Sequence, residues 1–568
     1  MHRMLIPALI LVSTLAFAQK TPAGQSPTGT VNVVTRQNDN QRTGQNLQET
    51  ILSRANVNSN SFGKIFSYPV DGQIYAEPLY VSNLTMAIGG VHNVVFVATE
   101  YDSVYAFDAD SAALNPNPLW HVNFLNPAAG VTPIPCVLGA GTCQLFPIVG
   151  ITGTPVINRA TNTIYVVART QELSGTTVNW VSRLHALDIT SGAEKPGSPA
   201  IICSAVGSAG CAFAGGSVIF QPSNQESRPG MMLVPEPGFP QGVLVMGFAG
   251  DSGWVLAYDP VALTLLGAFY TDDETSHSGK VPGEAGHGHS GIWGAGSGVA
   301  ADPNGYIYAI SGDGYWDGIN NWGDSLVKLA LTQNSSTGAY SLALADYFTT
   351  SDQACRYAHG LDYGAAGPLI LPTQSGATIP NLIFTQGKQN SECETTFAGY
   401  VVNRDNMGHV GGQVSQMTLP DGGGETPPAY FNTGTAQYIY NGGDSDSIRA
   451  FTVSAAGVST NPVMATKHVF ASGTSPVVSA NGTANGIVWA LEQTDDPDIQ
   501  PSMLPVVLHA FDAYHLAELY NSAQAPSGRD TAAPAVKFQV PMVANGKVYV
   551  GTLIELDVYG LCPCGGRR

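Results

Sequence analysis

Two histidines in a glycine-rich segment form the first candidate for metal chemistry in this sequence. His287 and His289 are separated by one glycine, with Glu284 close by, His277 upstream and His359 downstream. Side chains at positions i and i+2 lie on one face of an extended chain, and two imidazoles placed in this way can ligate zinc or copper. We therefore treat His287 and His289 as candidate metal ligands. A polar loop without a metal is the alternative interpretation.

An acidic run and the cysteines offer further reactive groups. Residues 495–498 read Asp-Asp-Pro-Asp, which suits loose calcium binding, with a solvated loop as the alternative. Six of the eight cysteines stand in three pairs along the chain, and disulfides are their usual state in an exported protein. The expected pairs are Cys136–Cys143, Cys203–Cys211 and Cys355–Cys393. For Cys562 and Cys564, a metal or redox role and a frayed tail are the two interpretations.

Several classes of function have no support in the sequence. There is no glycine-rich phosphate loop and no G-x-S-x-G nucleophile elbow, so nucleotide-dependent and serine-hydrolase functions are not indicated. The formal net charge is −19, and only 11% of the residues are charged. A nucleic-acid backbone is bound by clustered Lys and Arg, so nucleic acid is excluded as a partner.

The N-terminus has the pattern of a secretory signal peptide. His2 and Arg3 give a short positive start, and residues 4–18 are almost all apolar and end in Ala-Phe-Ala. Cleavage after Ala18 is therefore expected. No later apolar stretch is long enough for a transmembrane helix. We expect a protein that is exported to the periplasm or the extracellular space.

The elements that must position these side chains are short strands in a repeated order. Each copy holds a strand that often begins with Pro, a β-rich strand, a strand ending in an Ala-φ-Asp-like triplet, and an outer strand. The clearest copy covers 77–120, and its counterparts recur at intervals of about 40 to 75 residues. This pattern predicts an all-β fold, a β-propeller of four-stranded antiparallel blades. We predict eight blades, with seven as the fallback because the copy at 437–451 is weak.

Both ends of the chain contribute to the predicted propeller. The last copy, 540–561, lacks an outer strand, and the segment 63–70 ahead of the first copy can supply it. Closing the ring with strands from both termini removes free sheet edges, which promote aggregation. The predicted domains are a signal peptide at 1–18, an N-terminal extension at 19–58, the propeller at 59–561 and a tail at 562–568.

Two motifs connect the repeat with a known family. The Ala-φ-Asp triplets followed by Trp120, and the string Lys-Val-Tyr-Val-Gly-Thr at 547–552, resemble the pyrroloquinoline-quinone (PQQ) repeat. That repeat occurs in quinoprotein dehydrogenases and in related non-catalytic propellers. Over nearly all of the mature sequence the chain is similar to exported bacterial PQQ-repeat proteins, most clearly at 75–81, 92–99 and 403–408.

The middle of the chain resembles quinoprotein alcohol dehydrogenases in more detail. The segment 291–294 is similar to the family segment whose Trp forms the floor under the quinone ring, which implies that Trp293 stacks on the cofactor. The strand and turn at 306–316 resemble those that present a calcium ligand, here Asp313. The resemblance also implies that Asp362 is the catalytic Asp, with Asp313 as the other candidate near the reacting carbon.

Three further residues complete the site that this resemblance implies. The segments 387–389 and 403–406 resemble the family's Lys-Asn-Gly strand and Asp-Arg-x-Asn turn, which implies cofactor contacts from Lys388 and Arg404. Glu77 is the counterpart of the cofactor-binding Glu, although it stands immediately before its Pro and the family residue lies further upstream. The implied cofactors are PQQ and Ca²⁺.

The sequence departs from the family at the cysteines. None of them is next to another, so the family's disulfide ring over the quinone is absent, and no Cys-x-x-Cys-His is present to hold a c-type haem. Each candidate also has a structural alternative: Trp293 packs between sheets, Asp313 forms a turn, or Lys388 is solvated or paired. Asp362 would act as a general base only if burial or a cation tuned it.

Three functions therefore remain open. The first is a PQQ-dependent oxidoreductase that acts on a small alcohol or a sugar. The second is a non-catalytic propeller that binds protein or polysaccharide at the cell surface. The third is a metal-bound propeller enzyme that uses the loop containing His277, His287 and His289. A fold alone does not choose among them, because function depends on the site that the fold carries.

Overall fold

The computed structural model of the chain consists mainly of β-strands. Among the described residues the only α-helix is α2 (Gln353–His359). Short 3-10 turns are η1 (Arg36–Asn38), η2 (Pro127–Ala129), η3 (Tyr363–Ala365), η4 (Ser522–Gln524) and η5 (Pro526–Gly528). The structure describes residues 31–110, 117–136, 145, 147–207, 209–213, 216, 218–250, 252–273, 290–294, 296–389, 393, 399–417, 426–493 and 504–562. The predicted signal peptide, His277, Glu284, His287, His289, Cys143, Cys564 and the acidic run 495–498 lie outside these residues.

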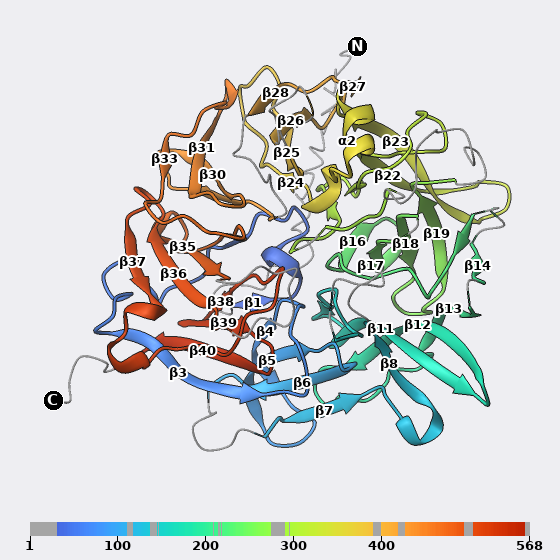
Figure 1. Ribbon diagram of the computed structural model, residues 1–568, viewed down its shortest axis with the longest axis horizontal. Coiled ribbons are helices and arrows are strands. Elements are labelled where there is room, and N and C mark those ends of the chain that lie inside the picture. The colour runs from blue at the N-terminus through green and yellow to red at the C-terminus, as the bar shows by residue number, and fades with distance from the viewer. Residues whose placement is uncertain are drawn as a thin grey trace, which may run out of the picture.

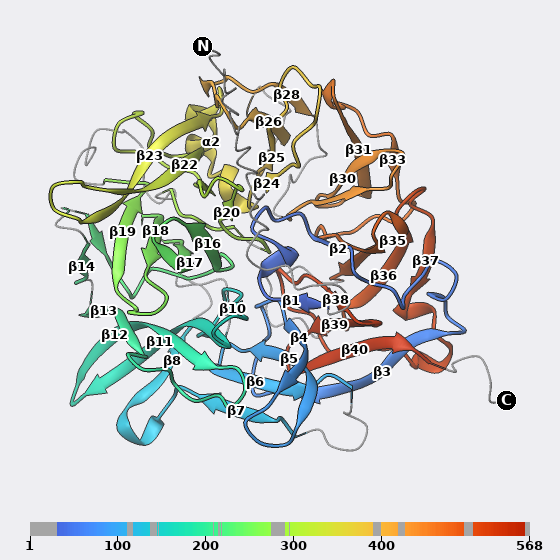
Figure 2. The same cartoon turned by 180° about the vertical axis from the view of Figure 1, so that it is seen from behind.

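The described strands form eight sheets of four or more strands around a common centre, the β-propeller arrangement that the repeat predicted (Figure 1, Figure 2). We number these sheets 1 to 8 in chain order. Sheet 1 contains β1 (Asn32–Val33), β4 (Leu79–Thr85), β5 (Val91–Ala98), β6 (Ser103–Asp108) and β7 (Trp120–Asn123). Sheet 2 contains β8 (Val131–Pro135), β9 (Ile148–Val149), β10 (Val156–Asn158), β11 (Thr163–Ser174), β12 (Thr177–Asp188) and β13 (Ala200–Val206).

The next three sheets repeat the antiparallel order from the inner strand outwards. Sheet 3 contains β16 (Met232–Glu236), β17 (Phe239–Phe248), β18 (Trp254–Tyr258) and β19 (Leu265–Tyr270). Sheet 4 contains β20 (Ala300–Ala301), β21 (Ile307–Ile310), β22 (Ser325–Gln333), β23 (Tyr340–Thr349) and the added parallel strand β27 (His409–Val410). Sheet 5 contains β24 (Leu369–Ile370), β25 (Leu382–Gln386), β26 (Gly399–Asn403) and β28 (Ser415–Met417).

The last three sheets include segments from both ends of the described chain. Sheet 6 contains β29 (Ala429–Asn432), β30 (Gln437–Gly442), β31 (Ile448–Ser454), β32 (Gly457–Val458) and β33 (Met464–Ala465). Sheet 7 contains β2 (Gln45–Asn46), β34 (Val477–Asn481), β35 (Ala484–Glu492), β36 (Val507–Asp512) and β37 (Glu518–Asn521). Sheet 8 contains β38 (Met542–Ala544), β39 (Lys547–Gly551), β40 (Glu555–Leu561) and β3 (Phe62–Pro69). A two-stranded sheet of β14 (Cys211–Ala212) and β15 (Ile219–Phe220) lies beside these.

Neighbouring sheets pack face to face, so the middle strands are apolar on both faces. All five residues of β18 are buried, for example. Separate apolar cores lie between sheets 2 and 3, between sheets 3 and 4 and between sheets 7 and 8, and another contains residues of sheets 8, 1 and 2. Tight hairpins join the strands. Asn545 and Gly546 connect β38 to β39 with φ values of 50° and 79°, as a two-residue turn of this handedness requires.

Sheet 8 joins the two ends of the described chain. β3 pairs antiparallel with β40, from Phe62 opposite Leu561 to Pro69 opposite Glu555. The sequence predicted that the segment 63–70 would supply this outer strand, and β3 occupies that position in sheet 8. Residues more than 480 positions apart in sequence are thereby held together by backbone hydrogen bonds.

The segment 32–46, which we call the central strap, runs around the centre and bonds to the inner part of every sheet in turn. The expected extension at 19–58 includes it, and nothing in its sequence indicated this role. Its contacts follow chain order. For sheets 1 to 4, β1 pairs with β4, Val34 O accepts from Ile157 N, Asn40 Nδ2 donates to Leu233 O, and Asn40 O accepts from Ala301 N. For sheets 5 to 8, Gln41 O accepts from Ile370 N, Thr43 O from Tyr430 N and Gly44 O from Val478 N, and Asn46 Nδ2 donates to Val543 O.

Two buried arginines fix the strap to the surrounding loops. Arg42 Nε donates to Val299 O at 2.9 Å, and its Nη2 lies 3.3 Å from Gly230 O. Arg36 Nε donates to Gly296 O at 3.0 Å. Each guanidinium has five donors in a fixed plane, which lets one side chain satisfy several carbonyls that burial removes from water.

Two disulfides have the pairing that the sequence predicted. Cys203 and Cys211 are joined with a Cα–Cα distance of 5.8 Å, and Cys355 and Cys393 with a Cα–Cα distance of 5.7 Å. Within the part of the chain that the structure describes, no helix has the length and apolar character needed to cross a membrane.

Candidate functional site

The candidate Trp and the candidate calcium ligand are brought together by two neighbouring loops. Gly312 N donates to Gly291 O at 2.8 Å, and Ser290 N donates to Asp313 O at 2.9 Å, so the loop before sheet 4 lies antiparallel to the turn after β21. A Cβ at Gly312 would lie 2.7 Å from Trp293 Nε1 and would also overlap Asp362 Oδ1. Only glycine therefore allows Trp293 and Asp362 to meet at this turn.

Asp362 and Lys388 form an ion pair beside this turn. Lys388 Nζ lies 2.8 Å from Asp362 Oδ2, and Asp313 N donates to Asp362 Oδ1 at 3.2 Å. The backbone fixes the lysine on both sides: Lys388 N donates to Asp362 O at 2.9 Å, and Lys388 O accepts from Arg356 Nη1 of α2 at 2.8 Å. We call Trp293, Asp313, Asp362 and Lys388 the Asp–Lys site.

A third buried carboxyl group lies behind the Asp–Lys site. Asp324 is fully buried, and its Oδ2 has no hydrogen-bond partner among the described residues, while its Oδ1 accepts from Tyr363 N at 3.0 Å. Burial raises the pKa of Asp324 well above its usual value; the Arg356 guanidinium opposes this rise, and the Asp313 and Asp362 carboxylates add to it. The site thus collects three buried carboxyl groups near one another.

The charge of Asp362 is set by its partners. Burial alone would raise its pKa, but the Lys388 ammonium and hydrogen bonds from Asp313 outweigh burial and hold the pKa of Asp362 below its usual value. Asp362 is therefore ionised at neutral pH, although it is only 9% exposed. A buried, ionised carboxylate next to an ammonium group can accept a proton or hold a cation.

The indole of Trp293 already contacts a flat cation. The Arg228 guanidinium lies over the Trp293 ring at 4.8 Å and over the Phe538 ring at 5.6 Å, and Arg228 Nε pairs with Glu226 at 2.6 Å. Lys537 Nζ also lies over the Phe538 ring, 5.4 Å from its centroid. A small hollow borders the region, lined by Arg36, Tyr75, Thr152, Arg228, Gly296 and Phe538.

Two predicted cofactor contacts lie elsewhere. Glu77 is buried against the central strap, where its Oε2 accepts from Gln37 N at 2.8 Å and lies 3.5 Å from Arg36 Nε. Arg404 follows the end of β26, whose Asn403 pairs with the start of β25, whereas Lys388 follows the end of β25. Arg404 therefore lies at the opposite end of sheet 5 from Lys388, 3.6 Å from Asp302. The structure does not bring these two residues to the Asp–Lys site.

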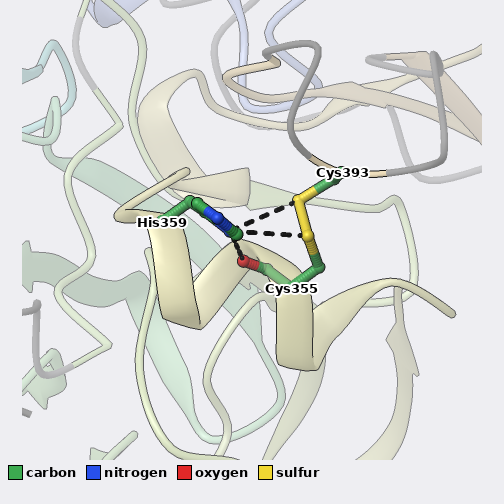
Figure 3. A group of neighbouring side chains, drawn as sticks. All are labelled: Cys355, His359 and Cys393. Atoms are coloured by element: carbon green, nitrogen blue, oxygen red, sulfur yellow. Dashed lines mark hydrogen bonds between the residues drawn. A yellow bond between two sulfur atoms is a disulfide. The ribbon is translucent and has the colours of Figure 1, made fainter. Parts of the chain in front are cut away.

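His359 is the described member of the predicted histidine group. It lies at the end of α2, and its Nδ1 is 2.9 Å from Cys355 O and 3.5 Å from Cys355 Sγ (Figure 3). Both sulfur atoms near it belong to the Cys355–Cys393 disulfide, so no thiolate is available here to bind a metal. The candidate ligands His287 and His289 lie outside the described residues.

Sequence reasoning missed Arg228, Asp324 and Arg356 in this region. Arg228 and Asp324 stand in loops with no spacing that indicates a shared site. Asp324 has a φ of 50°, a left-handed conformation that asparagine, aspartate and glycine adopt most readily, but many turns share this feature. Arg356 lies on α2, a helix of seven residues that the repeat pattern did not predict.

Comparisons with known proteins support the fold. No family model matches the sequence, and no curated protein matches it. A europium-containing methanol dehydrogenase has a similar structure, with a TM-score of 0.54 and 13% identity over 93% of this chain and 98% of that one. BamB from Moraxella catarrhalis matches with a TM-score of 0.47 and 11% identity over 88% of this chain and 99% of that one. Sqt1 from Saccharomyces cerevisiae matches with a TM-score of 0.45 and 10% identity over 89% of this chain and 100% of that one. The likeness to the methanol dehydrogenase confirms the expected distant similarity to quinoprotein alcohol dehydrogenases, at the level of the fold.

Proposed function

We propose that this chain is an exported oxidoreductase of the quinoprotein type, which binds PQQ and a hard cation at the Asp–Lys site and oxidises a small alcohol or a sugar. In this proposal each of the eight sheets is one blade of an eight-bladed propeller, and the pairing of β3 with β40 closes the ring. Export rests on the predicted signal peptide at 1–18 and agrees with the two disulfides.

One observation carries the proposal. Four residues that the family resemblance singles out separately in the sequence meet in space: Lys388 Nζ is 2.8 Å from Asp362, Asp313 N is 3.2 Å from Asp362, and Trp293 meets Asp362 at Gly312. Their positions span almost a hundred residues of sequence and two sheets. Such a group at strand ends is the usual way in which a rigid β-scaffold builds a reactive site.

The carboxyl groups suit a hard cation. Asp313 and Asp362 supply oxygen ligands, and the orphaned Oδ2 of Asp324 is a third buried oxygen in the same region. Oxygen-only ligand sets of this kind bind calcium, and the methanol dehydrogenase with the similar fold contains europium. A cation held by Asp313 and Asp362 would reduce the excess negative charge that raises the pKa of Asp324.

The surrounding side chains suit a flat, anionic quinone. The indole of Trp293 offers an apolar face, and Lys388, Arg228 and Lys537 are cations for the carboxylates of PQQ. When bound, PQQ supplies the two-electron oxidant that converts an alcohol to a carbonyl compound. Asp362, ionised at neutral pH, would take the proton of the substrate hydroxyl, and Lys388 would hold a quinone oxygen or carboxylate.

Reconstitution tests the proposal. The mature full-length protein is incubated with PQQ and either Ca²⁺ or Eu³⁺, and dye reduction is followed on a panel of alcohols and sugars. We expect activity that needs both PQQ and a cation and that Lys388→Met abolishes. Lys547→Met is the matched control, because Lys547 forms a similar 2.6 Å ion pair with Asp110 in another sheet. Absence of dye reduction on the whole panel with either cation would contradict the proposal.

A second function, a non-catalytic propeller that binds protein or polysaccharide, is favoured by one observation. Arg228 lies on the indole face that a quinone needs, and its ion pair with Glu226 is almost fully buried. The adjoining hollow also has room for only about 10 Å³, roughly one water molecule, whereas ligand pockets usually have roughly 300–1,000 Å³. If Arg228→Ala gained no PQQ binding and the unaltered protein had none, this second function would be preferred.

A further inference from the structure

Sheet 7 carries a group of histidine and glutamate side chains far from the Asp–Lys site in sequence. His468 stands in the segment between β33 and β34, Glu492 ends β35, His509 lies within β36, and Glu518 begins β37. We call these four residues the His–Glu cluster. His509 is fully buried, while the side chains of His468 and Glu492 are 31% and 18% exposed, so the cluster reaches from the interior to solvent.

Three ligand atoms of this cluster point to one place. His468 Nε2 is 3.2 Å from Glu492 Oε1, His509 Nε2 is 3.2 Å from Glu492 Oε2, and one ligand atom from each residue lies within 4.8 Å of the others. Ligands that bind zinc at about 2.1 Å in a tetrahedron stand about 3.4 Å apart. The cluster therefore already has nearly the donor separations of a metal site.

Glu518 fixes the orientation of the buried imidazole. Its Oε1 lies 3.0 Å from His509 Nδ1, and it is itself bonded by Asn521 Nδ2 at 3.3 Å and Gln524 Nε2 at 3.2 Å. A carboxylate on Nδ1 keeps the proton there and directs the lone pair of Nε2 away from it, as outer-shell carboxylates do for metal-binding histidines. In this cluster the His509 Nε2 then faces Glu492 and His468.

The second imidazole has an unsatisfied nitrogen. His468 Nε2 is buried and makes no hydrogen bond within the described part of the chain, although Glu492 Oε1 is only 3.2 Å away. Buried polar atoms are normally hydrogen-bonded, so an orphaned ring nitrogen directed at a carboxylate and a second imidazole needs an explanation. A cation held between these three groups satisfies all of them.

Sheet 2 contains the same framework without the ligand set. His185 of β12 has its Nδ1 2.7 Å from Glu194, nine residues later, as His509 has Glu518 nine residues later. His185 is opposite Val166 and His509 is opposite Ala490, so Ala168 occupies in sheet 2 the position that Glu492 has in sheet 7.

The ring that stacks on the histidine differs as well. Phe124 lies on His185 at 3.7 Å, whereas His468 lies on His509 at 4.4 Å. The repeat thus builds the histidine and its carboxylate in both sheets, and only sheet 7 replaces the neighbouring Phe and Ala with a histidine and a glutamate. The difference adds two metal ligands and no new packing element.

We propose that His468, Glu492 and His509 bind one divalent transition-metal ion of the zinc class, with Glu518 as the outer-shell partner of His509. Two imidazole nitrogens and one carboxylate suit zinc and its neighbours rather than calcium, which prefers oxygen ligands. Three protein ligands leave a fourth position for water or a ligand on the side where His468 and Glu492 are exposed. The ion would also link the segment that follows sheet 6 to the middle strands β35 and β36 of sheet 7.

The test is zinc titration of the mature full-length protein, prepared without a histidine tag and stripped with a chelator. Calorimetry is expected to give one tight site, and Co²⁺ is expected to give the visible spectrum of a tetrahedral N/O site. His468→Phe gives sheet 7 the phenylalanine ring that stacks on the histidine in sheet 2. Glu492→Ala gives sheet 7 the alanine that sheet 2 has at the matching position, Ala168. Each variant is expected to lower zinc affinity at least about 100-fold, since the loss exceeds that for an outer-shell partner.

Two controls make the result specific. His185→Gln alters the matched histidine of sheet 2 and is expected to leave zinc affinity unchanged. The double variant His287→Ala/His289→Ala tests the histidines of the loop and is also expected to leave the tight site unchanged. The proposal is overturned if the stripped protein shows no saturable zinc binding, if both sheet 7 variants bind zinc like the unaltered protein, or if the loop variant removes the tight site. If one sheet 7 variant fails to fold, as judged by circular dichroism, the other decides.

Discussion

The Asp–Lys site and the His–Glu cluster both hold buried or partly buried carboxylates, but they pair these carboxylates with different groups. At the Asp–Lys site a cation is built into the protein, since Lys388 Nζ lies 2.8 Å from Asp362. In sheet 7, within the described chain, neither Glu492 nor Glu518 is paired with a lysine or arginine, and both face imidazoles. Among the described residues, a buried carboxyl oxygen of Asp324 beside the first site has no hydrogen bond, and in the second a buried imidazole nitrogen of His468 has none.

The two regions also differ in how their carboxyl groups are charged. Near the Asp–Lys site the pKa shifts diverge: burial raises the pKa of Asp324, while Lys388 and hydrogen bonds from Asp313 hold the pKa of Asp362 below its usual value. In sheet 7 hydrogen bonds from His509 lower the pKa of both Glu492 and Glu518, although burial opposes this. In the two proposals, one fold thus offers an oxygen-rich site for a hard cation and a nitrogen-containing site for a softer one. The difference comes from the side chains and not from the sheets, which share an antiparallel order of four strands.

The largest expected effect separates the two sites by activity. Asp362→Asn keeps the shape of the side chain but removes the proton acceptor, so PQQ-dependent dye reduction is expected to fall by about 10²–10⁴-fold. Zinc affinity at the His–Glu cluster is expected to be unchanged. Steady-state kinetics and calorimetry on the same preparation check both results, and a variant with full activity would remove Asp362 from the mechanism.

The pH dependence of the free energy of unfolding tests whether the buried carboxyl group of Glu100 is protonated in the folded protein. Glu100 is fully buried, and its Oε1 has no hydrogen bond to any residue that the structure describes; burial raises the pKa of Glu100 from 4.5 to about 7. The folded protein then holds more protons than the unfolded one between these pH values, so this stabilisation is present below pH 4.5 and is lost as pH rises through 7. Glu100→Gln mimics the protonated carboxyl group and therefore keeps this stabilisation at every pH.

We therefore expect the free energy of unfolding of Glu100→Gln, relative to the unaltered protein, to increase by about 3 kcal/mol between pH 4 and pH 8. Denaturant unfolding at the two pH values measures this change. A difference between the proteins that does not vary with pH would show that Glu100 is ionised in the folded state.

The outer-shell carboxylate of sheet 7 should have a smaller effect than a direct ligand. Glu518→Gln leaves three ligands in place but weakens the orientation of His509, so zinc affinity is expected to fall about 10–100-fold. Glu194→Gln, the matched change in sheet 2, is expected to have no effect on zinc binding. Equal losses from both variants, measured by calorimetry, would contradict the outer-shell role of Glu518.

The smallest predicted effect concerns the glycine between Trp293 and Asp362. A Cβ at Gly312 would lie 2.7 Å from Trp293 Nε1 and overlap Asp362, so Gly312→Ala must displace one of them. We expect dye reduction to fall about tenfold and stability to fall by about 1–3 kcal/mol. Kinetics and thermal unfolding measure these changes. An alanine variant with unaltered activity would show that the positions of Trp293 and Asp362 beside Gly312 are not needed for function.

The strands were predictable because their signals are local. The apolar strings at 103–108, 184–188 and 508–512 lie in β6, β12 and β36, where both faces pack against neighbouring sheets. The central strap had no such signal, because its fifteen residues form no sheet with one another and find their partners on all eight sheets. Asn46, for example, bonds to Val543, 497 residues away.

The two sites were predictable only in part, because several of their residues come together from distant parts of the sequence. The resemblance to quinoproteins pointed to Asp362, Lys388 and Trp293. Arg228, on the face of that Trp, comes from the loop before sheet 3 and belongs to no motif. The His–Glu cluster has its ligands on three separate segments of chain with no metal-binding spacing. Only the pairing of β35 with β36 brings Glu492 and His509 together.

The most direct test of the central claim is the binding of PQQ itself to the Asp–Lys site. Equilibrium dialysis of the mature full-length protein against PQQ, with Ca²⁺ or Eu³⁺ present, gives stoichiometry and affinity without any assumption about the substrate. The proposed function predicts one saturable site per chain that needs the cation and that Lys388→Met weakens strongly, while Lys547→Met does not. No saturable binding with either cation, or binding that Lys388→Met leaves unchanged, would contradict it.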